Sequence, residues 1–321
     1  GDVYKRQSYM PQMKRYLILT ILLASVLFKA IAHTDADPVL MTINGEDVFQ
    51  SEFEYLYHKN NIQVTKQYSI DEFLDMFIVY RLKVVEAEAA GIDTTATLRN
   101  EFTEYCRQLA LPYLSKYNFS LGEEAFGALS EKEPVFRNVM NEYRNGILLF
   151  EISNRHVWEK SISDANGRDN YFRTHKNDYL WNEPHYKGYI VYAINDSLAK
   201  EANRFLQSRS IPSDSLRTTI SKAFGKDVKI ERTVAGKGEH PVVDHIAFGG
   251  KYPEQKGRWK AWFGYQGRII DTPEEASDVH AQLTADYQEH LEENWVNELR
   301  GKYNVKINHH VVDRLKAELK Q

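Results

Sequence analysis

The stretch from Asp271 to Asn308 constrains the fold most, because it predicts one long helix with a single apolar face. Thr272, Pro273 and Glu275 form a helix-start pattern, and Gly301 suits the left-handed residue after a last turn. Between them, large apolar residues recur every four positions: Val279, Leu283, Tyr287, Leu291, Trp295 and Leu299. This helix would be roughly 40 Å long at about 1.5 Å per residue. The short strand expected after it cannot cover the stripe, so a partner must come from elsewhere in the chain.

The first 32 residues contain a pattern typical of a secretory signal. From Met13, two basic residues precede the apolar run Tyr16–Phe28, and Ala30 and Ala32 occupy the two positions that a signal peptidase reads. The run is shorter than the ~20 residues that span a bilayer. We therefore expect export to the periplasm with cleavage after Ala32, and no stable membrane insertion afterwards.

Charge and cysteine content narrow the class of protein. The chain after Ala32 carries 36 Lys and Arg against 44 Asp and Glu, a formal charge of −8. An acidic surface argues against nucleic acid or anionic lipid as the main partner. The single cysteine, Cys106, cannot form an internal disulfide, and its place in a helical apolar pattern predicts a small core residue. Export without a disulfide suits a bacterial periplasm.

Apolar residues at helical spacing predict a mostly helical first half, with helices that begin near Ser51, Ser69, Thr95 and Pro134. The second has a capping pair, Ser69 and Glu72, and ends at Gly91. We expect Pro112 to end the third helix and residues 114–133 to be aromatic and irregular.

The pattern changes near Pro184, where strands begin to alternate with helices. Residues 185–268 read as a small α+β unit, with short strand-like pieces at Val242–Phe248 and Arg258–Phe263. The closing helix would then return to the helical part. The first strand, Leu40–Ile43, is expected to pair with the last, Val305–Ile307, so that both ends of the chain build one core.

Four stretches carry a resemblance to a known family. Residues 37–57, DPVLMTINGEDVFQSEFEYLY, resemble the N-terminal module of SurA-type periplasmic chaperones. Residues 73–95, 142–158 and 286–300 (FLDMFIVYRLKVVEAEAAGIDTT, EYRNGILLFEISNRHVW and DYQEHLEENWVNELR) are similar to the same module in Bacteroidetes members identified as peptidyl-prolyl isomerases. The stretches agree in order, and the resemblance covers most of the chain from Asp37 onward.

The resemblance implies an exported folding factor whose helical core binds unfolded outer-membrane or secreted proteins and carries inserted parvulin-type isomerase domains. It implies a mostly helical α+β fold with a SurA N-terminal-like core formed by both chain ends. The division expected is upstream residues and signal peptide at 1–32, helical core at 33–184, a parvulin-like α+β insertion at 185–268, and a returning helix and strand at 269–321.

The sequence departs from the family where isomerase chemistry belongs. About twenty residues separate Pro112 from Pro134, whereas a domain needs at least roughly fifty, so no parvulin module fits there. Residues 185–268 lack a Gly-Gly-Asp-Leu-Gly-like turn, and Gly249-Gly250-Lys251 is the nearest match. We therefore assign no catalytic residue and expect a degenerate relative of the parvulin domain.

An active isomerase stays open as an alternative, since the reaction needs an apolar pocket more than acid–base groups. The α+β unit supplies suitable residue types: His185, His245, Phe248, Trp259 and Phe263. His240, Asp244 and His245 have metal-ligand chemistry at a spacing that matches no strong motif. We predict no metal, no nucleotide and no other cofactor.

Four aromatic residues after Pro112 are the candidate contacts for a client polypeptide: Tyr113, Tyr117, Phe119 and Phe126. If exposed, they form the sequence-tolerant apolar surface that a binder of unfolded chains uses; otherwise they cap the helical core. The function expected is a periplasmic chaperone for unfolded or partly folded envelope polypeptides, without strong catalysis. The alternatives are an active peptidyl-prolyl isomerase and a non-catalytic structural protein of the envelope.

Overall fold

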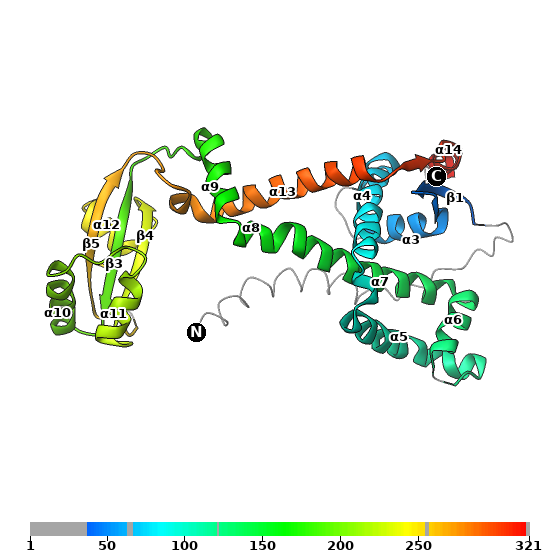
Figure 1. The fold of residues 1–321 in the computed structure, drawn as a ribbon, viewed down its shortest axis with the longest axis horizontal. Helices are drawn as coiled ribbons and strands as arrows, with labels where there is room; N and C mark the ends of the chain where they lie inside the picture. Colours follow the sequence, from blue (N-terminus) through cyan, green and yellow to red (C-terminus); the bar gives the residue numbers. More distant parts are fainter. Residues whose placement is uncertain (1–36, 63–66, 121, 254–256, 319–321) are drawn as a thin grey trace.

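The protein is a mostly helical α+β structure with two small three-stranded sheets (Figure 1). The computed structural model describes residues 37–62, 67–120, 122–253 and 257–318. The signal segment, with Ala30 and Ala32, lies outside the described residues. The helices and the two sheets confirm the mostly helical α+β fold class expected from the sequence.

The two ends of the described chain meet in one sheet. Its order is β2 (Glu46–Phe49), β1 (Val39–Ile43) and β6 (Val305–Ile307), all antiparallel. Met41 pairs with Ile307, and the main-chain N–H of Asn308 donates to the carbonyl of Leu40 at 2.8 Å. The predicted pairing of first and last strands is present, and α14 (His309–Glu318) packs beside it.

The first helices form the centre of the main core. α3 (Gln50–Asn61) places Phe53 edge-on against Phe73 and Phe77 of α4 (Ile70–Ala89), with ring centroids 5.5 and 5.4 Å apart. α4 begins with the predicted capping box, in which Ser69 and Glu72 bond each other's main-chain N–H. It ends before Gly91, whose φ of 69° is left-handed, and the short 3-10 turn η1 (Ile92–Thr94) follows.

The long C-terminal helix α13 (His280–Lys302) is the partner that completes this core. All six residues of its predicted stripe are buried, from Val279 just before the helix to Leu299 near its end. Trp295 stacks on His156 at 4.7 Å, and the ammonium of Lys83 lies 4.9 Å from the Trp295 ring centroid while it pairs with Glu292. These contacts join α13 to α4 and to the π-helical turn η2 (Asn154–Trp158).

The ends predicted for this helix are wrong. A 3-10 turn, η4 (Ala276–Val279), precedes α13, and the capping box is formed by Glu275 and Asp278 instead of Thr272 and Glu275. Gly301 lies inside the helix, which continues to Lys302. The helix start differs from the prediction because Lys187 and Arg232 of the second sheet bind the side chain of Asp278, which makes Asp278 part of the cap.

Pro112 does not end the third helix. α5 runs from Ala96 to Tyr117 with Pro112 inside it, and α6 (Glu123–Lys132) occupies the segment expected to be irregular. An internal proline costs about 3 kcal/mol. Burial against α6 and α7 (Pro134–Ser153) outweighs this cost. The residues of α5 that pack there lie on both sides of Pro112: Ala110, Tyr113, Leu114 and Tyr117.

One nearly continuous helical run crosses the molecule. It comprises α7, the π-helical turn η2 and α8 (Glu159–Ser163), and α9 (Ala165–Thr174) and the 3-10 turn η3 (Lys176–Tyr179) follow. In Figure 1 this run and α13 approach each other towards the second sheet, and α13 packs against η2, α8 and α9. The π turn lies where α13 packs against the run.

The second sheet has the order β4 (Val228–Gly236), β3 (His185–Ala193) and β5 (Ala261–Ile270), all antiparallel. One face is covered by α10 (Asp196–Gln207) and α11 (Leu216–Phe224), and the other by α12 (Pro241–Ala247). The strand expected at Val242–Phe248 is therefore wrong. His240 caps α12 and Pro241 occupies its first turn, a start that favours a helix.

The molecule is elongated, and the long helices α7–α8 and α13 connect the elements at its two ends (Figure 1). The second sheet and its helices form one end. The α5–α6 hairpin projects at the other end, to the same side of α13 in this view. We call the elements around β3–β5 the α+β unit, and α5, α6 and the first half of α7 the α5–α6 lobe.

Replacing Trp295 with alanine tests the packing of α13. We expect the free energy of unfolding to fall by about 3–5 kcal/mol, because a buried aromatic side chain is lost from the junction of α13, α4 and η2. Asn297→Ala on the exposed side of the same helix should change it by less than about 0.5 kcal/mol. Urea denaturation followed by far-ultraviolet circular dichroism measures both, and equal stability of the two variants would contradict this packing.

Candidate functional site

The structure brings the four candidate aromatic residues together in the α5–α6 lobe. The rings of Tyr117 and Phe119 stack with centroids 5.8 Å apart, and Tyr113 lies edge-on to the buried Phe136 at 5.9 Å. Phe126, from α6, belongs to the same apolar cluster. All four side chains are half-buried, so each contributes to the lobe's core and also reaches its surface.

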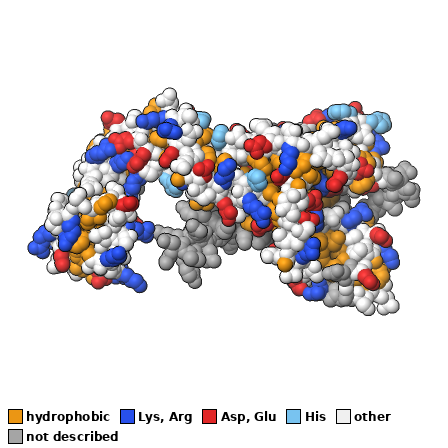
Figure 2. All heavy atoms as spheres, in the orientation of Figure 1, with side chains coloured by type: hydrophobic (Ala, Val, Ile, Leu, Met, Phe, Trp, Pro, Cys, Tyr) orange, Lys and Arg blue, Asp and Glu red, His pale blue; other side chains and the backbone are white. Residues whose placement is uncertain are grey.

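This lobe has a thin core. Among the described residues, its apolar cluster holds three buried and seven partly buried members. The main core holds twenty-six buried and ten partly buried members. Leu111 of α5 and Val135 of α7 are 56% and 51% exposed, and Figure 2 shows hydrophobic side chains at the surface of this end of the molecule. The lobe thus has few fully buried apolar side chains and several that reach its surface.

Charged side chains surround the stacked pair. Lys132 lies 5.3 and 5.0 Å from the ring centroids of Tyr117 and Phe119, and Lys116 lies 4.8 Å from that of Tyr117. The hydroxyl of Tyr117 donates to Glu133 at 2.6 Å, and hydrogen bonds from Lys116 and Tyr117 lower the pKa of Glu133. The aromatic faces are therefore covered by flexible lysine chains, which can move aside for an incoming side chain.

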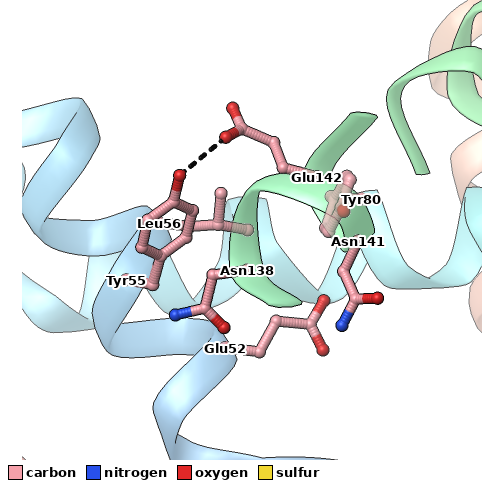
Figure 3. A pocket seen from close by; sticks show the side chains of 7 residues that line it. All are labelled: Glu52, Tyr55, Leu56, Tyr80, Asn138, Asn141 and Glu142. Atoms are coloured by element: carbon pink, nitrogen blue, oxygen red, sulfur yellow. Dashed lines mark hydrogen bonds between the residues drawn. The ribbon is translucent and has the colours of Figure 1, made fainter. Parts of the chain in front are cut away.

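A small cavity between α3, α4 and α7 is lined by polar side chains but is too small to hold a ligand (Figure 3). Its volume is about 10 Å³, which fits roughly one water molecule. Tyr55 donates to Glu142 at 3.0 Å across its rim. Burial raises the pKa of Glu52, and its ion pair with Arg81 at 3.1 Å opposes that shift. This polar group ties three helices together and leaves no space for a substrate.

The aromatic and histidine residues considered for isomerisation do not converge. Phe248 packs on the α12 face of the second sheet, whereas Phe263 packs on the α10–α11 face. His185 stacks on Trp181 at 3.8 Å, where the chain enters β3. The His245 ring nitrogen is hydrogen-bonded to the carbonyl of Gly250 at 3.0 Å and lies beside Tyr252 and Trp262.

The residues weighed as metal ligands have structural partners. His240 accepts from the N–H of Val243 at 3.3 Å and lies 3.2 Å from the hydroxyl of Tyr192. Asp244 accepts from the N–H of Gly238 at 2.7 Å. In the described part of the chain, no three His, Cys, Asp or Glu residues gather to hold a metal ion. Cys106 is buried, and burial raises the pKa of its thiol to about 11, which suits an inert core residue.

A charged cluster joins the α+β unit to α13; we call it the Asp278 clasp. Asp278 in η4 accepts hydrogen bonds from Lys187 of β3 at 2.9 Å, from Arg232 of β4, and from the main-chain N–H groups of Glu274 and Glu275 at 2.9 and 3.2 Å. Its carboxylate is fully buried. Glu274 also pairs with Lys187 and Arg268, and the Glu275 carboxylate pairs with Lys187 and Arg232. Three cations therefore face three carboxylates.

The clasp was not predicted from the sequence. Its carboxylates lie close together, but its cations come from three separate strands, Lys187, Arg232 and Arg268. Only the antiparallel register of the second sheet places them at one end. A run of three carboxylates within five residues was the one available signal, and a run of this kind is usually solvated.

Comparison with known proteins gives only distant likenesses, all among solved structures. No family model and no curated protein matches the chain. Among solved structures, a chain from work on PEB4 and Cj1289, two SurA-like chaperones of Campylobacter jejuni, is 14% identical. The match covers 84% of this chain and 99% of that one, with a TM-score of 0.33. It is too remote to assign a family.

Among the described residues, no helix is both long enough and apolar enough to cross a bilayer.

The clasp predicts a stability change in acid. Burial raises the pKa of Asp278, but hydrogen bonds from Lys187, two main-chain N–H groups and Arg232 outweigh it, and the net pKa is lowered. The stabilisation is therefore complete above the ordinary aspartate pKa of about 3.9 and is lost as the pH falls towards the lowered value.

We expect Asp278→Asn to destabilise the protein by roughly 3 kcal/mol at neutral pH, because two cations lose a buried partner. The difference from the unmodified chain should shrink below about pH 4. Asp47→Asn, at an exposed residue, serves as the control. Thermal unfolding between pH 3 and pH 7 measures this, and a constant difference across that range would show that the clasp carboxylate contributes no ionic stabilisation.

Proposed function

We propose that this protein is a periplasmic chaperone that holds non-native envelope polypeptides without strong catalysis. The observation that carries the proposal is the thin core of the α5–α6 lobe, with stacked, half-buried aromatic rings and exposed apolar neighbours. An unfolded client offers apolar side chains without a fixed shape. A half-buried aromatic surface covered by movable lysines can receive them in many registers.

The arrangement of the chain supports the same proposal. We propose the division 33–184, 185–268 and 269–321, with 1–32 as upstream residues and signal peptide. In this division the helical core is built from both ends of the chain, and the α+β unit is an insertion. Burial of the α13 stripe and the Asp278 clasp supply stability away from the lobe. The lobe can therefore stay partly exposed while the scaffold remains folded.

The placement in the periplasm rests on the pattern from Met13 to Ala32 and on the absence of a disulfide-forming cysteine pair. The clients proposed are unfolded or partly folded outer-membrane and secreted proteins. Their recognition would use side-chain apolarity, which such chains expose before they fold.

Changing both Tyr117 and Phe119 to serine tests the lobe surface. We expect the variant to remain folded and to suppress the aggregation of a chemically denatured model client several-fold less than the unmodified chain, because the stacked pair is lost. Light scattering after dilution of denatured client from guanidinium measures this.

The matched control is the pair Phe49→Ser and Tyr68→Ser, which removes two aromatic side chains that are 43% and 37% exposed outside the lobe. Equal loss in both double variants would show that suppression depends on general surface apolarity. No suppression by the unmodified chain would favour a structural envelope protein instead.

Peptidyl-prolyl isomerisation is a second candidate, favoured by one observation. On the α12 face of the second sheet, His245, Tyr252 and Trp262 form a cluster with ring centroids 5.1–5.5 Å apart, and Tyr252 is 58% exposed. We expect the full chain to leave the cis–trans rate of a proline tetrapeptide near its uncatalysed value, because the His245 ring is held by its hydrogen bond to the carbonyl of Gly250. Acceleration that His245→Ala abolishes would replace the chaperone proposal with the isomerase.

A further inference from the structure

The two edges of the second sheet differ. On the β5 side, the register shifts between Lys187 and Tyr189, and Gln266 has a left-handed φ of 50°. This is a β-bulge, a common device against pairing with another chain. On the β4 side, nine residues pair with β3 in unbroken register. Among the described residues, no further strand covers the outer edge of β4.

The direction of the free main-chain groups of β4 follows from two hydrogen bonds. The N–H of Ile194 donates to Asp227, beside β4, and the carbonyl of Ala193 accepts from Lys260, beside β5. Because main-chain groups alternate along a strand, even-numbered residues of β3 bond β4. Their β4 partners are odd-numbered in this register. The N–H and C=O groups of the even-numbered residues therefore point outward: Val228, Ile230, Arg232 and Val234.

These outward groups have no main-chain partner in the described part of the chain. None of the backbone hydrogen bonds outside the sheets involves Ile230, Arg232 or Val234. At the end of the strand, by contrast, the N–H of Gly236 is satisfied by Glu239 at 2.8 Å. β4 thus presents a regular open edge over most of its length, and it carries no proline or bulge.

A hollow of about 600 Å³ lies along this edge; we call it the edge groove. Its lining includes sheet residues and the start of α11: Tyr189, Leu216, Arg217, Ile230, Arg232 and Val234. The sheet residues among them are on the face that α10 and α11 cover. An open strand edge supplies main-chain hydrogen bonds, and a hollow on one face supplies room for alternate side chains of an added strand.

The charges of the groove define the ligand further. Arg232 is already paired with Glu275 and Asp278, and Glu231 is paired with Lys229. Arg217 is exposed and has no ion-pair partner among the described residues. The remaining charge at the groove is therefore positive, beside apolar Leu216 and Ile230. It complements a carboxylate that is flanked by apolar residues at alternate positions.

We propose that the edge of β4 binds an extended segment of a client polypeptide as a fourth strand, with alternate apolar side chains in the edge groove and a carboxylate against Arg217. The proposal rests on the proposed function for its client and deepens it. The α5–α6 lobe would bind side chains of the client, whereas the edge of β4 would bind its main chain.

Val234→Pro tests the edge, because it removes an outward N–H that no described residue uses. The control Val234→Ala shortens the side chain and keeps the N–H. The probe is a fluorescein-labelled ten-residue peptide of alternating valine and threonine with one central aspartate, added to the full chain. We expect Val234→Pro to weaken binding about tenfold, from loss of one to two hydrogen bonds, and Val234→Ala to weaken it less than about threefold.

Arg217→Glu tests the charge, with Lys222→Glu on the same helix as its control. We expect Arg217→Glu to weaken the aspartate peptide and to leave an asparagine peptide unchanged, while Lys222→Glu affects neither. Equal response of the two peptides would remove the carboxylate from the proposal.

Two N-methylated peptides keep the test decisive if Val234→Pro does not fold. Methylation of one alternating set of N–H groups should abolish binding to the unmodified chain, and methylation of the other set should not. Equal binding of both methylated peptides would overturn the added strand.

Sedimentation of the chain alone tests the alternative that a second copy of the chain binds the edge of β4. A dimer that Val234→Pro disrupts, together with no peptide binding, would replace the proposal with self-association through β4. If the chain suppresses client aggregation but binds no peptide, the strand site is refuted and the proposed function stands. If the chain binds the peptide but does not suppress client aggregation, the proposed function is refuted and the strand site stands.

Discussion

The packing of α13 across α4 and the π-helical turn is the contact on which the rest of the structure depends. It brings together strands that are more than 260 residues apart, Met41 and Ile307. Closing so long a loop costs roughly 5 kcal/mol in chain entropy, since the cost grows only with the logarithm of length. Four large side chains of α13 are buried in the main core, Tyr287, Leu291, Trp295 and Leu299. At about 1.5–3 kcal/mol each they exceed that cost. Burial of α13 therefore offsets the entropic cost of closing the long segment between the two ends of the chain.

Different interactions therefore hold the two ends of α13. Near the terminal strands, α13 is held by apolar contacts and by ion pairs with α4, such as Lys302 with Glu86. At its other end, η4 is held by the charges of the Asp278 clasp. An apolar contact tolerates small sliding, whereas a buried carboxylate with four donors fixes direction. The clasp thus sets how the second sheet is carried relative to the helices, and the lobe at the opposite end is free of that constraint.

Much of this arrangement could be predicted from the residues, and the failures have a common cause. The α13 stripe, the Ser69 capping box and the pairing of the terminal strands follow from periodicity and local chemistry, which the sequence displays directly. The predictions for Pro112 and for the segment around Val242 are wrong, because packing with α6 and α7 decides the first and the His240 cap decides the second. The four candidate aromatic residues of the lobe lie in one apolar cluster, but their half-buried state depends on α6, a helix not expected there. Whether they bind a client stays a prediction. The clasp and the open edge of β4 arise from strand register, which one sequence does not specify.

The register also explains why one sheet can have a closed and an open edge. Tyr186 packs its ring against Gly188, Gly264 and Gly267, and a Cβ on Gly267 would lie 2.3 Å from that ring. The bulge in β5 therefore accommodates a large core residue, and closure of that edge is a by-product of core packing. The register of β4 is unbroken, and its side chains pack against α10, α11 and α12. A regular nine-residue edge is an aggregation hazard unless something limits it. Here Lys229 and Glu231 place charges along the strand, and Arg232 is tied to the clasp. Charges at these positions oppose the edge-to-edge pairing of folded copies, whereas the proposed client strand comes from a flexible chain.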